Sequence, residues 1–320
     1  MDQTKQIIIL AVDDFSAEQQ HIIKSAVEEW ALVKTIAQTT GEAMYRQQLA
    51  TADICIGWPN ATWLKGSPVK FLQIGSSGWD AYQHEGLEAI GGFHLCTAKG
   101  IYTIGLVEHA IAMMFALVRR LPAHFRDKEQ GAFKRHLPYA PEITGARACI
   151  VGMGDAGILL AGKLKRLDMY VTAVLKTTAR SLEDADKVFQ AKDLKHAVAD
   201  ADHIFLLVPG TPENENLFDK AIFDVCKPSA YFYNLSRGSN VEEKALYESL
   251  VKNKIAGAGL DVTGVEPLPP GDRLWKLGDN VLITGHSAGL STGHPQRFCE
   301  LVIRNLSHYH FHRPLENRVI

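Results

Sequence analysis

Short runs of apolar residues alternate with amphipathic stretches along almost the whole chain. In the first hundred residues the apolar runs are Ile7–Val12, Ala31–Ile36, Ile54–Ile56, Phe71–Ile74 and Phe93–Cys96. Between them, Glu18–Glu29 and Glu42–Leu49 show helical spacing of apolar and polar residues. Strands that alternate with helices are typical of an α/β fold with a parallel sheet. This pattern predicts a small open-sheet domain at the start of the chain.

A second alternating series follows a long apolar segment. Lys99–Arg120 predicts one long buried helix, which Leu121-Pro122 would end, and a polar loop over 126–142. Six further apolar runs, the number in a complete dinucleotide-binding fold, are Ala148–Val151, Val171–Leu175, His203–Val208, Tyr231–Leu235, Ala256–Asp261 and Asn280–Thr284. The helical pattern at 292–309 would return to the first domain. We expect one domain of residues 1–99 with 290–320, and another of residues 100–289.

Composition narrows the classes of protein and partner. A chain of 320 residues is too long for one ordinary core, and its 46% hydrophobic and 22% charged residues are typical of a soluble globular protein. The formal net charge of -2 favours neither nucleic acid nor membrane as a partner. The five cysteines form no CxxC pair and no zinc pattern. We therefore expect free buried thiols, no metal and a cytoplasmic location.

A glycine-rich turn, Gly152-Met153-Gly154-Asp155-Ala156-Gly157, joins a predicted strand to a predicted helix over Ile158–Leu167. In a dinucleotide-binding turn the first glycine makes the bend, the second admits the pyrophosphate and the third lets helix and strand pack closely. The helix N-terminus supplies amide donors to the phosphates. We expect Gly152, Gly154, Asp155, Ala156 and Gly157 to bind a cofactor; the alternative is a structural turn in another α/β protein.

The end of the next predicted strand bears on the choice of cofactor. An NAD-specific domain normally places Asp or Glu there to bind the ribose 2′-hydroxyl. Here the place holds Leu175-Lys176-Thr177-Thr178, and Arg180 follows. Lys176, Thr178 and Arg180 are suited to binding a 2′-phosphate, which favours NADP over NAD. The alternatives are NAD itself and a solvated loop face.

Arg237, Glu266 and His286 each come just after an apolar run. Ligands of open α/β sheets bind at the carboxyl ends of the strands, so these residues are expected to meet there. A fixed cation, a carboxylate and an imidazole beside a dinucleotide can move a hydride and a proton at a carbonyl. Singly, they could be a surface ion pair, a loop carboxylate and an exposed histidine; together they predict an oxidoreductase.

Several motifs in order identify a family resemblance. They are the glycine-rich turn, Val208–Glu213, Asn234–Gly238, Leu260–Pro269 and His286–Gly289, with Gly75–Asp80, Thr103 and Val107–Ala110 before them. Over nearly its whole length the chain resembles the D-isomer-specific 2-hydroxyacid dehydrogenase family. The resemblance implies two doubly wound parallel-sheet α/β domains, a flavodoxin-like substrate domain and a Rossmann dinucleotide-binding domain, with the cleft between them.

The resemblance also implies roles for individual residues. Arg237 would bind the carboxylate or carbonyl oxygen of the substrate, and His286 would exchange the proton. Glu266 would hydrogen-bond and orient the imidazole. The backbone amides of Ser77 and Gly78 would hold the substrate carboxylate. Further candidates for cofactor contact are Val208, Pro209, Leu235, Thr103 and Asp261, the last at the nicotinamide carboxamide.

The expected activity is reduction of a small 2-ketoacid, as in glyoxylate and hydroxypyruvate reductases, by a homodimer formed through the cofactor domain. Two alternatives remain: oxidation of phosphite by the same three residues, and a non-enzymatic, nucleotide-sensing scaffold like some transcriptional corepressors. The formate dehydrogenase branch carries Gln in place of Glu266. The loop 96–102 departs from the family pattern, so Lys99 and Tyr102 are candidates for shaping selectivity, as are Trp58, Trp79 and Arg297.

Overall fold

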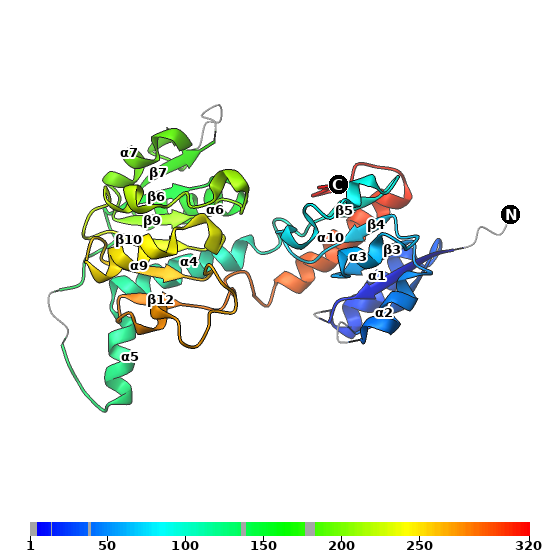
Figure 1. The fold of residues 1–320 in the computed structure, drawn as a ribbon, viewed down its shortest axis with the longest axis horizontal. Helices are drawn as coiled ribbons and strands as arrows, with labels where there is room; N and C mark the ends of the chain where they lie inside the picture. Colours follow the sequence, from blue (N-terminus) through cyan, green and yellow to red (C-terminus); the bar gives the residue numbers. More distant parts are fainter. Residues whose placement is uncertain (1–4, 14, 38–39, 136–138, 177–182) are drawn as a thin grey trace. The chain divides into compact units, whose positions relative to one another are not determined.

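The computed structural model describes residues 5–13, 15–37, 40–135, 139–176 and 183–320. The chain divides into two compact units, residues 1–102 with 291–320, and residues 103–290. Each unit is built on one parallel β-sheet with helices beside it (Figure 1). The predicted α/β class with two parallel sheets is therefore confirmed.

The first unit contains a five-stranded sheet in the order β2-β1-β3-β4-β5. Its strands are β1 (Gln6–Ala11), β2 (Ala31–Thr35), β3 (Ile54–Gly57), β4 (Phe71–Gln73) and β5 (His94–Cys96). This order, with one reversal beside β1, is the flavodoxin-like arrangement. The central strands are buried on both faces, which explains why they read as continuous apolar runs instead of alternating ones.

The helices of this unit are α1 (Ala17–Val27), α2 (Glu42–Leu49), α3 (Ala61–Leu64) and α10 (His294–His310). Helix α10 packs against α1 and places Phe298, Val302 and Leu306 in the core. The C-terminal segment then returns to the sheet, where Arg318 forms an antiparallel bridge with Cys96 of β5 (Figure 1). The last thirty residues thus complete the core that the first hundred begin.

The second unit contains a seven-stranded parallel sheet in the order β12-β11-β10-β9-β6-β7-β8. The strands are β6 (Arg147–Val151), β7 (Tyr170–Leu175), β8 (Lys187–Gln190), β9 (His203–Leu206), β10 (Tyr231–Asn234), β11 (Gly257–Leu260) and β12 (Val281–Ile283). The strand order reverses between β6 and β9. In such doubly wound sheets, ligands bind at the carboxyl ends of the strands beside this reversal.

The helices beside this sheet are α4 (Thr103–Val118), α5 (Leu121–Glu129), α6 (Asp155–Lys165), α7 (Leu194–Ala199), α8 (Lys220–Phe223) and α9 (Glu243–Val251). Helix α4 packs against α6, β10 and β11, and it buries Val107, Met113 and Leu117. Among the described residues, no helix combines the length and the apolar character that crossing a membrane requires.

Two elements differ from the sequence prediction. Leu121-Pro122 does not lead into a polar loop but begins a second helix, α5 (Leu121–Glu129), because proline is compatible with the first helical turn. Arg120 makes the bend before it with a left-handed φ of 55°. The edge strand β8 was not predicted, since only Val188 and Phe189 in it are apolar and both are half-buried.

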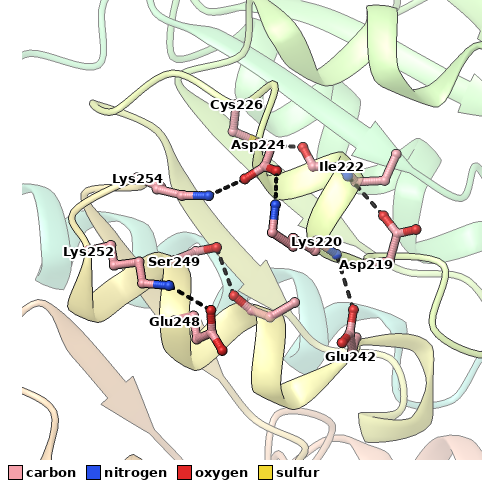
Figure 2. A network of polar contacts seen from close by, with 11 residues as sticks. Asp219, Lys220, Ile222, Asp224, Cys226, Glu242, Glu248, Ser249, Lys252 and Lys254 are labelled. Atoms are coloured by element: carbon pink, nitrogen blue, oxygen red, sulfur yellow. Dashed lines mark hydrogen bonds and ion pairs between the residues drawn. The ribbon is translucent and has the colours of Figure 1, made fainter.

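Polar contacts join α8 to α9 on the second unit (Figure 2). Asp219 caps α8 by accepting a hydrogen bond from the Ile222 amide at 2.9 Å. Asp224 pairs with Lys220 and Lys254, and these two hydrogen-bonded ammonium groups lower the pKa of its carboxyl to about 2. Because solvent screens such exposed pairs, they orient the loops more than they stabilise the fold.

A buried histidine lies within the second sheet. The ring of His203 on β9 stacks between Tyr231 and Tyr233 of β10, with ring centroids 5.7 and 6.0 Å away. Its Nδ1 lies 3.1 Å from the Tyr233 hydroxyl, and the residue is only 3% exposed. Burial disfavours the charged imidazolium and lowers the pKa of His203 to about 4.

This buried imidazole predicts a pH-dependent stability. With a pKa lowered in the fold, His203 contributes its stability above the unfolded pKa of about 6.5, and the contribution is lost as pH falls toward 4. We expect wild type to lose about 2 kcal/mol from this group between pH 7.5 and pH 5. Urea unfolding at both pH values should show a smaller loss for His203→Phe, whereas exposed His21→Gln serves as the control. An equal loss in His203→Phe and wild type would contradict the prediction.

Candidate active site

The turn between β6 and α6 is built around three glycines. Gly152 adopts a φ of +106°, and a Cβ there would lie 2.8 Å from the Leu207 carbonyl. A Cβ on Gly157 would lie 2.2 Å from the carbonyl oxygen of Gly152, so only glycine allows α6 to approach the turn. A Cβ on Gly154 would meet none of the described atoms within 4 Å. The backbone at Gly154 is therefore open to a bound phosphate at the N-terminus of α6.

The cation expected to select the cofactor is paired with a carboxylate. Lys176 follows β7, and its Nζ lies 2.9 Å from Oε2 of Glu213. Both side chains are exposed, by 83% and 72%. Thr178 and Arg180, the other two residues expected to select NADP, lie outside the described residues. Of the three residues expected to bind a 2′-phosphate, Lys176 is thus the one that the structure describes.

The remaining candidates for cofactor contact lie at the ends of helices and strands. Asp155 and Ala156 begin α6, Val208 and Pro209 follow β9, Leu235 follows β10, and Thr103 begins α4. Leu235 is 5% exposed and belongs to the hydrophobic core around α4 and α6. Its side chain is thus a packing group, and only its backbone is placed to meet a cofactor.

Arg237, Glu266 and His286 follow β10, β11 and β12, three neighbouring parallel strands. Gly238 brings the first two loops into contact, since a Cβ there would lie 1.9 Å from the Thr263 carbonyl oxygen. The His286 amide joins the third loop by donating to the carbonyl of the residue after β11, at 2.8 Å. The structure therefore places the loops that carry all three residues together in one unit.

The imidazole of His286 is oriented by a carboxylate. Its Nδ1 lies 2.6 Å from Oε2 of Glu266, whose Oε1 accepts a hydrogen bond from the Thr263 amide at 3.1 Å. Because a carboxylate can only accept, Nδ1 carries the shared hydrogen, which leaves Nε2 to exchange a proton with a substrate. His286 is half exposed and has a left-handed φ of 52°. Such a φ in a non-glycine residue is uncommon and is often found at functional sites.

The backbone around Arg237 is fixed by a buried amide. Nδ2 of Asn234 donates to the Arg237 carbonyl at 3.1 Å, while its Oδ1 accepts from the amide and hydroxyl of Ser236. Nη1 of Arg237 donates to the Ser236 carbonyl at 2.8 Å, and the side chain is half-buried. A guanidinium is always charged, and its planar fork of N–H donors suits an anionic ligand.

Asp261 is a buried carboxylate that holds the loop on both sides of His286. Its Oδ1 accepts from the Thr284 hydroxyl at 2.5 Å and from the Ser287 amide at 3.0 Å. Its Oδ2 accepts from the Ala288 amide at 3.0 Å, and the residue is 3% exposed. These contacts give Asp261 a positioning role. Contact with the nicotinamide carboxamide remains a prediction.

His109 on α4 joins this network, although no role was assigned to it from the sequence. Its Nε2 lies 3.1 Å from Oγ1 of Thr284 and 3.8 Å from Oδ1 of Asp261. Because the Thr284 hydroxyl gives its hydrogen to Asp261, His109 Nε2 must be the donor to Thr284. A polar side chain beside Glu108 in a mostly apolar helix was the local signal in the sequence, since the partners of His109 lie more than 150 residues away.

Ser77 and Gly78, the predicted carboxylate loop, lie in the first unit, whereas Arg237, Glu266 and His286 lie in the second. The loop is held at Ser76, whose hydroxyl donates to the Gly78 carbonyl at 2.7 Å and whose carbonyl accepts from the Ala98 amide at 2.8 Å. The Ser77 hydroxyl lies 3.4 Å from the carbonyl of Ala98. The loop is thus anchored on the segment that follows β5.

The residues proposed to shape selectivity have varied surroundings in this unit. The Tyr102 hydroxyl donates to the Gly75 carbonyl, and Trp58 packs against Gly75, so both support the carboxylate loop. Nε of Arg297 donates to the Ile101 carbonyl at 2.7 Å. For Lys99, the described contact is made by its backbone, which accepts from Asn317. Trp79 packs against the core around β3 and β4.

Comparison with known families gives a match over more than half of the chain. Residues 111–288 match the family model described as D-isomer specific 2-hydroxyacid dehydrogenase, NAD binding domain. The match begins within α4 and ends just after His286. It therefore contains the glycine-rich turn and the three strand-end residues.

Individual relatives cover the chain to different extents. The D-3-phosphoglycerate dehydrogenase of Archaeoglobus fulgidus is 35% identical over 62% of this chain and 37% of that protein. The glyoxylate reductase of Korarchaeum cryptofilum is 32% identical over 67% of this chain and 65% of that protein. The chain thus spans less than two thirds of the length of these relatives. A solved acyclic imino acid reductase in complex with NADPH and D-Arg has the same fold, with a TM-score of 0.85 and 21% identity over 98% of this chain and 100% of that one.

Proposed function

Because the chain belongs to the D-isomer-specific 2-hydroxyacid dehydrogenase family, we propose that it is an NAD(P)-dependent reductase of small 2-ketoacids. The main support for this function is the 2.6 Å contact between His286 and Glu266. It lies beside the loop of Arg237 and in the same unit as the glycine-rich turn. Relatives named glyoxylate reductase support this substrate class. The description of the family as D-isomer specific supports a D configuration in the product.

The chain's own residues supply the parts of this reaction. A reduced nicotinamide, when bound, supplies the hydride that adds to C2 of the ketoacid. Arg237 would bind the carboxylate and polarise the carbonyl oxygen, where negative charge develops. His286, protonated at both ring nitrogens before the step, would give the Nε2 proton to that oxygen. Glu266 would then hold the neutral imidazole through Nδ1. The amides of Ser77 and Gly78 are proposed to complete the carboxylate site.

The cofactor is proposed to be NADP, with NAD as the alternative. The open backbone at Gly154 and the N-terminus of α6 fit a pyrophosphate. At the end of β7 the chain carries Lys176 where an NAD-specific domain carries a carboxylate. Lys176 is paired with Glu213, but both side chains are exposed, so a 2′-phosphate can displace this pair at little cost.

A second copy of the chain is the proposed partner, bound through the cofactor unit. Large apolar side chains are exposed along α4, α5 and the segment after them, including Phe115, Leu121 and Phe125, the last by 62%. Several large apolar side chains that are exposed within one short segment of chain favour an interface with another protein chain. Sedimentation equilibrium should give a dimer for wild type and a monomer for Phe125→Asp, while a monomeric wild type would refute the proposal.

The activity is tested by following oxidation of NADPH and NADH with glyoxylate, hydroxypyruvate, pyruvate and phenylpyruvate. We expect turnover with at least one ketoacid and a preference for NADPH. Lys176→Ala should weaken NADPH binding and leave NADH binding nearly unchanged, because it removes only the proposed partner of the 2′-phosphate. The same assay should include D-3-phosphoglycerate with the oxidised cofactors, because this chain is 35% identical to a D-3-phosphoglycerate dehydrogenase over the matched residues.

Other outcomes of this assay would favour a different cofactor, substrate or function. Turnover that prefers NADH would support the proposed reductase activity but refute the choice of NADP as cofactor. Turnover with phosphite alone would identify phosphite, and not a ketoacid, as the substrate. The same three residues would then act on phosphite. Cofactor binding without turnover of any of these compounds would favour the nucleotide-sensing scaffold.

A further inference from the structure

The loop after β9, residues 207–210, lies between the glycine-rich turn and Arg237. At one end, a Cβ on Gly152 would lie 2.8 Å from the Leu207 carbonyl and 3.0 Å from Cγ1 of Val208. At the other end, a Cβ on Gly210 would lie 2.7 Å from Cγ and 3.3 Å from Cβ of Arg237. The stem of Arg237 therefore rests on Gly210, in space that any other residue would occupy.

Asn240 ties this loop to the loop that carries Arg237. Its Nδ2 lies 3.2 Å from the Val208 carbonyl, 3.4 Å from the Pro209 carbonyl and 3.1 Å from Oγ of Ser236. The residue is fully buried in the short turn after Arg237. One amide group thus joins the segments that follow β9 and β10, which are neighbouring strands.

The orientation of the Asn240 amide is determined by its partners. Two of them are carbonyl oxygens, and the third, the Ser236 hydroxyl, gives its hydrogen to Asn234. All three accept, so only the NH2 group of Asn240 can face them. Its Oδ1 is buried without a hydrogen-bond partner among the described residues. Asn240 thus keeps this orientation although its oxygen is unpaired. The contacts of its nitrogen with the two loops stabilise it there.

We propose that Gly210 and Asn240 are positioning residues that set the Arg237 side chain for the ketoacid carboxylate. Gly210 leaves the space for its stem, and Asn240 fixes the distance between the two loops. Because Val208 and Pro209 are also proposed to contact the cofactor, the same loop links cofactor binding to the placement of Arg237. This inference rests on the proposed reductase activity.

Gly210→Ala is the direct test, because Gly210 has no left-handed φ and alanine fits its backbone. The added Cβ must displace the Arg237 stem. We expect kcat/KM for the ketoacid to fall about 10- to 100-fold, since small errors in the position of a binding group are costly. The dissociation constant of NADPH should change less than about twofold. Gly271→Ala is the matched control, because a Cβ there meets none of the described atoms within 4 Å.

The decisive measurement is the double variant with Arg237→Ala. If Gly210 acts through Arg237, adding Gly210→Ala to Arg237→Ala should change kcat/KM by less than about twofold. A further loss of tenfold or more would show that Gly210 acts by another route and would overturn the inference. An active Gly210→Ala single variant, with wild-type kcat/KM, would also overturn it. An active Arg237→Ala would instead refute the proposed function.

Asn240→Asp tests the role of Asn240 with a replacement side chain of the same shape. It replaces the NH2 donor by an oxygen that faces the carbonyls of Val208 and Pro209. We expect a rise in KM for the ketoacid and in the inhibition constant of oxamate, a carboxylate that cannot be reduced. A loss of thermal stability without any change in these two constants would assign Asn240 a purely structural role and overturn its part of the proposal.

Discussion

Replacing His286 by asparagine is expected to lower kcat for the ketoacid by about 1000-fold, the range for removing a general acid. Asparagine is the suitable replacement because it tolerates the left-handed φ of 52° at this position. It cannot supply a proton to the developing alkoxide. Steady-state rates at saturating substrate measure the effect, with the NADPH dissociation constant as a control for the cofactor site.

The pairing with Glu266 predicts a smaller effect for Glu266→Gln. Glutamine keeps an oxygen that can accept from Nδ1, so the ring stays oriented, but the negative charge beside the imidazolium is lost. We expect about a tenfold fall in kcat, between wild type and His286→Asn. If both variants retain wild-type kcat, proton transfer does not involve this pair, and the proposed mechanism is wrong.

Replacing Arg237 by alanine is expected to lower kcat/KM by about 1000-fold, because both carboxylate binding and polarisation of the carbonyl are lost. Arg237→Lys should recover only part of this loss. Lysine keeps the charge but not the planar pair of donors that matches a carboxylate. The comparison of the two variants separates the contribution of charge from that of geometry.

The control for Arg237 is the exposed pair around Asp224 on the same unit. Lys254→Ala removes a cation that precedes β11, at the opposite end of the strands from the proposed ligand contacts, and kcat/KM should stay at the wild-type value. An equal loss in Lys254→Ala and Arg237→Ala would attribute the effect to general destabilisation. Retained kcat/KM in Arg237→Ala would remove this residue from the site.

The sequence alone determined the fold class and the placement of the three strand-end residues. Apolar runs such as Ile54–Ile56 become strands because both faces of a parallel sheet are covered. The glycine-rich turn was readable because its requirements, a positive φ and close contacts, act over six residues. The weakly apolar run of β8 was not predicted, because its pairing with β7 decides that it forms a strand. The proline near the start of α5 was taken as a helix stop, although proline is also compatible with a first helical turn.

Only the tertiary structure decided how the site is supported. The contacts of His109 with Thr284, of Asn240 with Val208 and of Gly210 with Arg237 join residues far apart in the chain. Their geometry depends on which strands are neighbours and how far each loop extends beyond its strand. Periodicity along the chain carries no such information, because it reports which face of an element is buried and not what lies against it.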